Sequence, residues 1–292
     1  MVAGSSRQCA ERRFPLATGT LAALHFPAAV EGAPRVLALH GWLDNAASFT
    51  ALANALPELE VLALDLAGHG RSDWRPPAGS YALVDHLPEL LEVLDALGWP
   101  SCTLLGHSMG AAIACLFAVA APDRVDRLIC IDALGPLSLD EADSAARLRR
   151  ALSARREPQP RRRLFARIED ACVQRGELNG LSAESIAPLV ERGLAKVADG
   201  WIWAADPRLQ LPSALPMSEA QVQQLLRALS VPVLVLAADV PDPRLPKLQV
   251  HARLDCVPQV QYARLPGGHH LHIAETERTA AEIQCFLASG PG

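Results

Sequence analysis

Short apolar runs recur along this chain, and stretches with a different pattern separate them. Each run is rich in Val, Leu and Ile, and the runs lie at Val36–His40, Val61–Asp65, Cys102–Gly106, Leu128–Asp132, Val233–Ala237 and Val260–Leu265. Continuous apolar runs of this length are typical of strands that are covered on both faces. We therefore expect one central sheet whose strands are mainly parallel.

Amphipathic stretches between the runs predict helices. Leucines recur at helical spacing through Val84–Leu97, and apolar residues do so through Glu275–Leu287. Strands that alternate with helices indicate an α/β fold. Near the start of the chain, Phe14–Phe26 holds a Thr18-Gly19 turn and is predicted to form an antiparallel hairpin at the sheet edge.

The alternation stops between Gly135 and Ser230. This stretch is helical in pattern, is interrupted by prolines and contains no clear strand. Because strand signals resume after it, we interpret it as an insertion in the core and not as a second domain in tandem. The expected division is a core of residues 1–136 and 231–292, with a helical cap of residues 137–230 inserted in it.

Bulk composition limits the classes of protein to consider. The chain has 292 residues, of which 50% are hydrophobic and 20% charged, a balance typical of a globular enzyme. A net charge of -5 provides no overall attraction to nucleic acid or to an anionic membrane. No apolar run approaches the roughly 20 residues that span a bilayer, and Met1–Arg13 lacks the apolar centre of a signal peptide. We expect a cytoplasmic protein with a small-molecule partner; the pattern predicts no oligomeric state.

Arginines gather at the start of the expected cap, and two interpretations are open. The residues are Arg147, Arg149, Arg150, Arg155, Arg156, Arg161, Arg162 and Arg163. They form either solvated helix faces or an anion-binding patch. Acidic residues elsewhere offset their charge, which favours the solvated faces.

The cysteines do not predict a disulfide framework. There are seven, an odd number, and no C-x-x-C pair occurs among them. Cys102, Cys115, Cys130 and Cys285 lie in apolar segments and are expected to be small buried hydrophobic residues.

A glycine-flanked serine follows one of the predicted strands. The sequence Gly106-His107-Ser108-Met109-Gly110 joins the run Cys102–Gly106 to a stretch of small residues with helical pattern. In a G-x-S-x-G turn the glycines permit a sharp, strained bend, so that the serine hydroxyl stands clear at the carboxyl edge of the sheet. Ser108 is therefore the candidate nucleophile, and the alternative is a Gly-Ser turn without chemistry.

A serine hydroxyl needs a neighbouring base before it can attack. The best candidate among nine histidines is His269, which follows the last strand and two glycines. Its neighbours His270 and His272 suggest a metal site, but no carboxylate or cysteine completes a ligand set at suitable spacing. We expect no metal and no cofactor, and we expect His270 and His272 to pack or to form hydrogen bonds locally.

A tetrahedral intermediate also needs donors for its oxyanion. Backbone N–H groups supply them, one from the residue after the nucleophile and one from a loop after an earlier strand. Met109 is the first candidate, and Trp42 in the His40-Gly41-Trp42 segment is the second. His40 is expected to hold this loop in place.

Taken in order, four motifs resemble those of the α/β-hydrolase superfamily, and within it those of the serine-hydrolase-like proteins. They are His40–Asn45, Asp65–Ser72, Gly106–Gly110 and Gly268-His269. The resemblance covers roughly residues 14–288 and implies an α/β-hydrolase fold, with a mostly parallel central sheet, flanking helices and an inserted helical cap. It assigns the nucleophile to Ser108, the base to His269 and the oxyanion donors to Trp42 and Met109.

The acid of the triad is open at this stage. Members of the superfamily commonly carry it shortly after the strand that here is Val233–Ala237, and that position falls near Pro241, between Asp239 and Asp242. The other location, which haloalkane dehalogenases use, falls on Asp132. Because the acid must reach the imidazole, its reach matters more than its order in the chain. We prefer Asp132, with Asp239 and then Asp242 as the alternatives. The structural alternative for Asp132 is a carboxylate that caps the loop leading into the inserted segment.

Other polar and aromatic residues receive structural interpretations. Asp65 or Arg71 is expected to tie down the Asp65–Ser72 loop by hydrogen bonds, without a catalytic role. Asp206 and Arg208 are expected to form an ion pair. Phe165, Trp201 and Trp203 either line a substrate pocket or are simply packed.

The leading functional hypothesis is hydrolysis of a small carboxylic ester through an acyl-serine intermediate. A serine at the elbow argues against dehalogenase and epoxide hydrolase chemistry, which in this fold use aspartate there. Hydrolysis of C–C bonds, lactones or thioesters, and perhydrolysis, are alternatives on the same core. A ligand-binding homologue without turnover is the alternative from another class.

Overall fold

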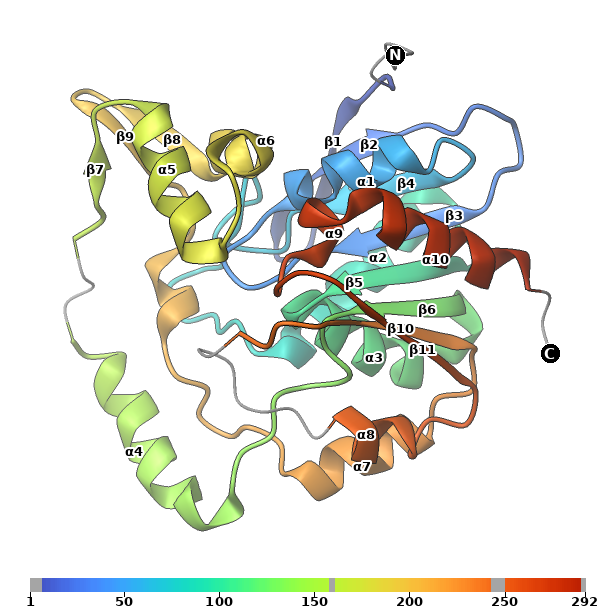
Figure 1. Ribbon diagram of the computed structural model, residues 1–292. Helices are drawn as coiled ribbons and strands as arrows, with labels where there is room; N and C mark the ends of the chain where they lie inside the picture. Colours follow the sequence, from blue (N-terminus) through green and yellow to red (C-terminus); the bar gives the residue numbers. More distant parts are fainter. Residues whose placement is uncertain (1–6, 158–160, 243–249, 290–292) are drawn as a thin grey trace.

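The central feature of the computed structural model is an eight-stranded sheet with the order β1-β2-β4-β3-β5-β6-β10-β11 (Figure 1). The structure describes residues 7–157, 161–242 and 250–289. Only β2 runs against its neighbours in this sheet. The strands are β1 (Ala10–Leu16), β2 (Gly19–Phe26), β3 (Arg35–Leu39), β4 (Glu60–Leu64), β5 (Cys102–His107), β6 (Val125–Ile131), β10 (Val233–Ala238) and β11 (Val260–Leu265). The six predicted strands and the antiparallel edge hairpin are therefore confirmed.

Helices cover both faces of this sheet, which explains why its strands are continuous apolar runs. Leu90, Ile113 and Leu226, from α2, α3 and α7, pack in the core on one face. Leu52, Ile283 and Phe286, from α1 and α10, pack on the other. The core helices are α1 (Thr50–Ala55), α2 (Leu87–Leu97), α3 (Met109–Ala120), α7 (Glu219–Arg227), α8 (Val250–Leu254), α9 (Leu271–Ala274) and α10 (Thr276–Ala288). Within the described residues, no helix has both the length and the apolar character that a membrane crossing requires.

The segment between β6 and β10 holds three short strands as well as helices, so the expectation of no clear strand there is wrong. An antiparallel sheet with the order β7-β9-β8 packs against α5 and α6. Gly200 turns the chain between β8 and β9 with a φ of 147°, a conformation that favours glycine. Before α7, which packs on the sheet, the segment's helices and strands are α4 (Ser144–Ala154), β7 (Leu164–Phe165), α5 (Ile168–Asn179), α6 (Ala183–Gly193), β8 (Leu194–Val197) and β9 (Gly200–Trp203).

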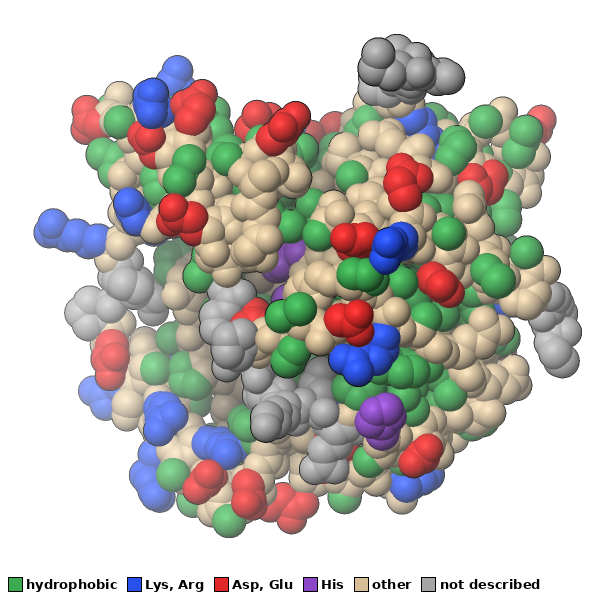
Figure 2. Space-filling model, viewed as in Figure 1, with side chains coloured by type: hydrophobic (Ala, Val, Ile, Leu, Met, Phe, Trp, Pro, Cys, Tyr) green, Lys and Arg blue, Asp and Glu red, His purple; other side chains and the backbone are tan. Residues whose placement is uncertain are grey.

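The arginines at the start of this segment lie on the surface. In Figure 2 Lys and Arg side chains gather over the region of α4, which Figure 1 shows apart from the central sheet. Arg147 pairs with Asp143 at 3.1 Å, one turn earlier. Arg162 and Arg163 stack over the rings of Trp74 and Phe165. This arrangement agrees with the solvated faces that we favoured from the sequence.

All seven cysteines are free, and most of the expected burial is observed. Cys102, Cys115 and Cys130 are buried, as predicted. The prediction is wrong for Cys285, which is exposed on α10. Its neighbour Phe286 turns into the core, so Cys285 lies on the solvent side of the helix.

A buried carboxylate joins the segment between β6 and β10 to the core. Asp65, directly after β4, is fully buried and accepts hydrogen bonds from Arg192 Nε at 2.9–3.0 Å. It also accepts from the backbone N–H groups of Ala46 and Arg71, at 2.7 and 2.8 Å. A Cβ on Gly70 would lie 2.4 Å from this carboxyl, so only glycine lets the loop close around it. Asp65 therefore ties down the loop, as predicted.

Neutralising this carboxylate should destabilise the fold strongly. Asp65→Asn leaves the Arg192 guanidinium buried without a full counter-charge, and loss of one partner from a buried pair costs about 3–5 kcal/mol. Adding Arg192→Met to Asp65→Asn should restore part of that loss, because the orphaned charge goes with it. Denaturant unfolding of the three variants measures both effects.

Asp239→Asn is the matched surface control for this experiment. Asp239 and Arg264 pair at 3.3 Å with both side chains about half exposed, so the change should fall within about 0.5 kcal/mol. A double variant that is less stable than Asp65→Asn alone would contradict the interpretation.

Candidate active site

Ser108 lies at a sharp turn between β5 and α3. Both flanking residues must be glycine because neighbouring backbone atoms lie too close for a side chain. A Cβ on Gly110 would lie 1.9 Å from the carbonyl oxygen of Leu39, and one on Gly106 would lie 2.4 Å from Ala111 Cα. Helix α3 thus begins directly against the carboxyl end of β3. Ser108 has φ 52° and ψ −114°, a strained conformation for a residue with a side chain.

His269 reaches the serine from the loop after β11. Gly267, with a φ of 99°, turns the chain two residues before it. The imidazole Nε2 lies 2.9 Å from Ser108 Oγ, within hydrogen-bond distance. The side chain retains 11% exposure, so a small molecule at the serine can touch it. The structure therefore brings the predicted nucleophile and base together.

Asp132, at the end of β6, holds the other nitrogen of the same imidazole. Its Oδ2 accepts a hydrogen bond from His269 Nδ1 at 2.6 Å, and its Oδ1 accepts one from Ala238 N at 2.9 Å. Burial alone would raise the pKa of Asp132, but the hydrogen bonds from His269 and Ala238 outweigh it and lower this pKa. The carboxylate is therefore held ionised, with Nδ1 of the imidazole carrying a hydrogen.

The alternative acid, Asp239, lies elsewhere. It is exposed and pairs with Arg264 on the neighbouring strand β11. The structure thus joins Asp132, and not Asp239, to the imidazole. The physical reason is that β6 lies between β5 and β10 in the sheet, next to the strand that carries Ser108.

The two expected oxyanion donors lie on the segments predicted for them. Met109 is the first residue of α3, where a backbone N–H has no partner within the helix and the helix dipole favours negative charge. Trp42 lies in the loop after β3, and its indole Nε1 donates to the carbonyl oxygen of Leu209 at 3.0 Å. This bond anchors the ring on the segment between β6 and β10.

His40 holds the loop of Trp42, as predicted. Its Nδ1 donates to the carbonyl oxygen of Gly41 at 2.7 Å, while its Nε2 accepts from the Leu66 backbone N–H at 3.0 Å. Both contacts need the neutral imidazole with its hydrogen on Nδ1. Complete burial lowers the pKa of His40 and so favours that form.

His107 joins the three segments of the site, a role that the sequence analysis missed. It precedes the serine, and its Nε2 donates to the carbonyl oxygen of His269 at 2.9 Å. Its Nδ1 faces Asp44 Oδ2, in the loop of Trp42, at 3.6 Å. Burial lowers the pKa of His107 to about 4. His107 occupies the first variable position of the G-x-S-x-G pattern. The motif assigns no role to that position, so the sequence did not indicate this contact.

Asp44 is the second residue that the sequence analysis missed. It is buried, and its carboxylate accepts from Arg175 Nη2 at 2.7 Å and from His270 Nε2 at 3.1 Å. Burial alone would raise the pKa of Asp44, but the contacts with His270 and Arg175 hold this pKa well below its ordinary value. Arg175 belongs to α5, so this contact is a second link between the core and the inserted segment.

The two other histidines near the base bond to distant residues, so the expectation that they pack or bond locally is only partly right. His270 bonds to Asp44, and His272 Nε2 lies 2.7 Å from Ser48 Oγ. The partners are 226 and 224 positions away in the sequence. The reason is that the loop after β11 lies against the loop after β3.

The aromatic residues of the inserted segment take different positions. Phe165 is buried against α5 and α6, whereas Trp203 borders a hollow. That hollow, counted together with the open solvent at its mouth, measures ≈ 860 Å³ and is also lined by Gln174, Arg175, Glu177 and Leu178. Histidine side chains are visible in the recess between this part of the molecule and the core (Figure 2). Asp206 and Arg208 form the predicted ion pair, at 2.6 Å.

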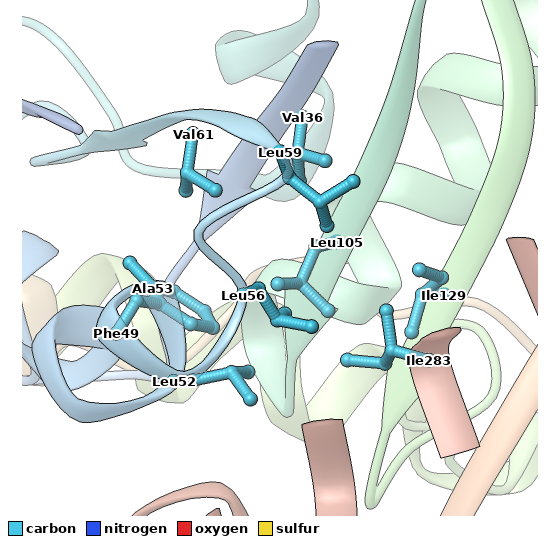
Figure 3. A pocket seen from close by; sticks show the side chains of 10 residues that line it. All are labelled: Val36, Phe49, Leu52, Ala53, Leu56, Leu59, Val61, Leu105, Ile129 and Ile283. Atoms are coloured by element: carbon cyan, nitrogen blue, oxygen red, sulfur yellow. The ribbon is translucent and has the colours of Figure 1, made fainter. Parts of the chain in front are cut away.

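A second gap lies within the core and is unsuited to an ester. All ten side chains that line it are apolar (Figure 3): Val36, Phe49, Leu52, Ala53, Leu56, Leu59, Val61, Leu105, Ile129 and Ile283. A site that orients a polar substrate needs at least a few polar groups. We therefore interpret this gap as a packing feature.

Comparisons with known proteins identify the family and the fold of this chain. Residues 34–275 match the model of a family described as the alpha/beta hydrolase fold. Serine hydrolase-like protein 2 of Homo sapiens is 32% identical over 277 residues, which cover 87% of each chain. A serine hydrolase-like protein of Dictyostelium discoideum is 29% identical over 272 residues, 88% of this chain and 76% of that protein. The crystal structure of a hypothetical protein from Pseudomonas aeruginosa PAO1 has a TM-score of 0.86 at 37% identity, and the match covers 96% of this chain and 99% of that one.

The strain at position 108 generates a stability prediction. Ser108→Gly and Ser108→Ala both remove the hydroxyl, and the Ser108 side chain makes no capping hydrogen bond to α3. Glycine tolerates a positive φ, whereas alanine keeps the strain, so the glycine variant should be more stable by about 1 kcal/mol. Denaturant unfolding of the two variants measures the difference. Equal stabilities would mean that the turn relaxes without cost.

Proposed function

The chain belongs to the α/β-hydrolase fold family and is, at the coarse level of its relatives, a hydrolase of the serine type; from that premise we propose that it is a carboxylesterase for small esters. One observation carries the proposal. His269 bridges Ser108 Oγ and Asp132 Oδ2, at 2.9 and 2.6 Å, in the arrangement that activates a serine. The proposed catalytic residues are Ser108, His269 and Asp132.

In the first half of the proposed reaction the serine becomes acylated. His269 Nε2 takes the hydroxyl proton while Ser108 Oγ attacks the ester carbonyl, and Asp132 stabilises the imidazolium that forms. The N–H groups of Met109 and Trp42 hold the oxyanion. When the C–O bond to the alcohol breaks, His269 returns the proton to the leaving alkoxide.

In the second half, water releases the acid. His269 takes a proton from the water as its oxygen attacks the acyl carbonyl, and a second tetrahedral intermediate forms at the same two donors. Collapse breaks the bond to Ser108 Oγ, which regains its proton from His269. The products are a carboxylic acid and an alcohol, and the protein returns to its starting state.

A fluorophosphonate probe tests whether the serine is activated. We expect the protein to be labelled at Ser108, because an activated hydroxyl attacks the phosphorus as it attacks a carbonyl. Mass spectrometry of the labelled peptide identifies the site, and Ser108→Ala is the matched control that should show no label. Hydrolysis of short p-nitrophenyl esters gives the second measurement.

One pair of results would overturn the proposal. If folded protein is neither labelled by the probe nor able to hydrolyse short p-nitrophenyl esters, the chain is a hydrolase homologue without esterase turnover. Labelling at a residue other than Ser108 would overturn the assignment of the nucleophile.

The assignment of the acid has its own test. Asp132→Asn should lower kcat for ester hydrolysis by roughly 10³–10⁴-fold, since the amide no longer stabilises the imidazolium. Asp239→Asn should keep wild-type activity, because its partner is the surface residue Arg264. Activity of the two variants toward p-nitrophenyl acetate decides between them, and loss of activity only in Asp239→Asn would reverse the assignment.

A further inference from the structure

Three buried side chains beside the triad bring ligand atoms to a common point. The ligand atoms of Asp44, His107 and His270 all lie within 4.8 Å of one another. Asp44 Oδ2 lies 3.6 Å from His107 Nδ1 and 3.1 Å from His270 Nε2. The sequence did not predict this set, since its carboxylate is 226 positions from His270.

The hydrogen-bond pattern leaves a lone pair on His107 Nδ1, which faces this point. A carbonyl oxygen only accepts, so the bond from His107 Nε2 to the His269 carbonyl fixes a hydrogen on Nε2. In the neutral ring Nδ1 then presents a lone pair, and among the residues that the structure describes it has no hydrogen-bond partner. It faces a carboxylate oxygen, which is also an acceptor. A buried pair of facing acceptors is unfavourable unless a proton or a metal cation lies between them.

The spacing suits a tetrahedral transition metal ion. Zn²⁺ binds histidine nitrogen and carboxylate oxygen at about 2.0–2.2 Å, which places two ligands of a tetrahedral site about 3.3–3.5 Å apart. The two distances from Asp44 Oδ2, 3.6 and 3.1 Å, lie on either side of that spacing. We propose that Asp44, His107 and His270 bind a divalent transition metal ion of the Zn²⁺ class, with the hydrogen of His270 shifted from Nε2 to Nδ1 and one coordination position left for water.

Arg175 controls access to the proposed site. It donates to Asp44 Oδ1 at 2.7 Å and also lines the ≈ 860 Å³ hollow beside α5, together with Glu177. Its side chain is 14% exposed, so it can turn into the hollow and uncover the carboxylate. Because a guanidinium and a metal ion compete for one carboxylate, Arg175 opposes binding of the ion.

A bound ion would also act on the base of the triad, a consequence that rests on the proposed function. The rings of His107 and His269 lie 4.7 Å apart, centre to centre. A nearby dication disfavours the imidazolium that His269 forms in both halves of the reaction. Saturating Zn²⁺ should therefore inhibit ester hydrolysis by roughly tenfold or more, because the ion repels the positive charge that forms on His269.

Binding is tested without turnover by Co²⁺ absorption and Zn²⁺ calorimetry on the full chain. We expect one equivalent of Co²⁺ to give the visible absorption of a tetrahedral site, and Zn²⁺ to displace it. His270→Gln and Asp44→Asn should lose the absorption and bind Zn²⁺ at least tenfold more weakly. His251→Gln, which changes an exposed histidine on α8, is the control and should bind as the wild type does.

Arg175→Met gives a result that a purely structural role does not produce. Removal of the competing cation should tighten Zn²⁺ binding by roughly tenfold, even if unfolding in EDTA shows the variant to be less stable. Thermal melts in EDTA establish that each variant is folded before metal is added.

Three outcomes would overturn the site: no Co²⁺ absorption in folded wild-type protein, unchanged binding in both His270→Gln and Asp44→Asn, or weaker binding in Arg175→Met. Stoichiometric Co²⁺ binding in a protein without esterase activity would support the site while it contradicts the proposed function.

Discussion

The buried charge of Asp65 is the interaction on which the arrangement of the molecule depends. It holds Arg192 from α6 and, on the core side, the backbone N–H groups of Ala46 and Arg71. Ala46 directly follows the loop that carries Trp42 and Asp44, so one carboxylate fixes both that loop and helix α6. Separation of these groups would leave a buried charge without its partners, which is costly. Helix α6, the segment at Ala46 and the loop of Arg71 therefore keep their positions relative to one another.

A constraint of a different kind acts at the carboxyl edge of the sheet. Among the described residues other than glycine, a positive φ occurs at Leu43, Ser108 and Asp132, with values of 60°, 52° and 50°. They follow β3, β5 and β6, which are neighbours in the parallel part of the sheet. Each such residue costs of order 1–3 kcal/mol and persists only where its surroundings hold it. The strained residues therefore lie together at the carboxyl edge of the sheet, where Ser108 and Asp132 approach His269.

Parts of this structure follow from local patterns, and other parts do not. The runs around Leu37 and Leu234 are apolar because both faces of the sheet are covered, so the sequence predicts these strands directly. The short strand Leu164–Phe165 has too few residues to show a period, and the sequence analysis missed it. The choice between Asp132 and Asp239 depends on reach, which is a property of neighbouring strands and not of sequence order. The contact between His270 and Asp44 joins residues that are 226 positions apart in the sequence, and no local pattern indicates it.

The position of the carboxylate on β6 has a consequence for how this chain can change. Because Asp132 holds the imidazole, the segment that follows β10 does not have to deliver a side chain to it. A side-chain substitution at Asp239 therefore leaves the pair of His269 and Asp132 in place, provided that the Ala238 N–H still reaches Asp132 and that Asp239 N and Val240 N still bond to the carbonyl oxygens of Leu265 and Gly267. The side chain at position 239 is therefore not tied to the reaction centre. Position 239 is also a place where a designer can introduce a new side chain beside an unchanged reaction centre.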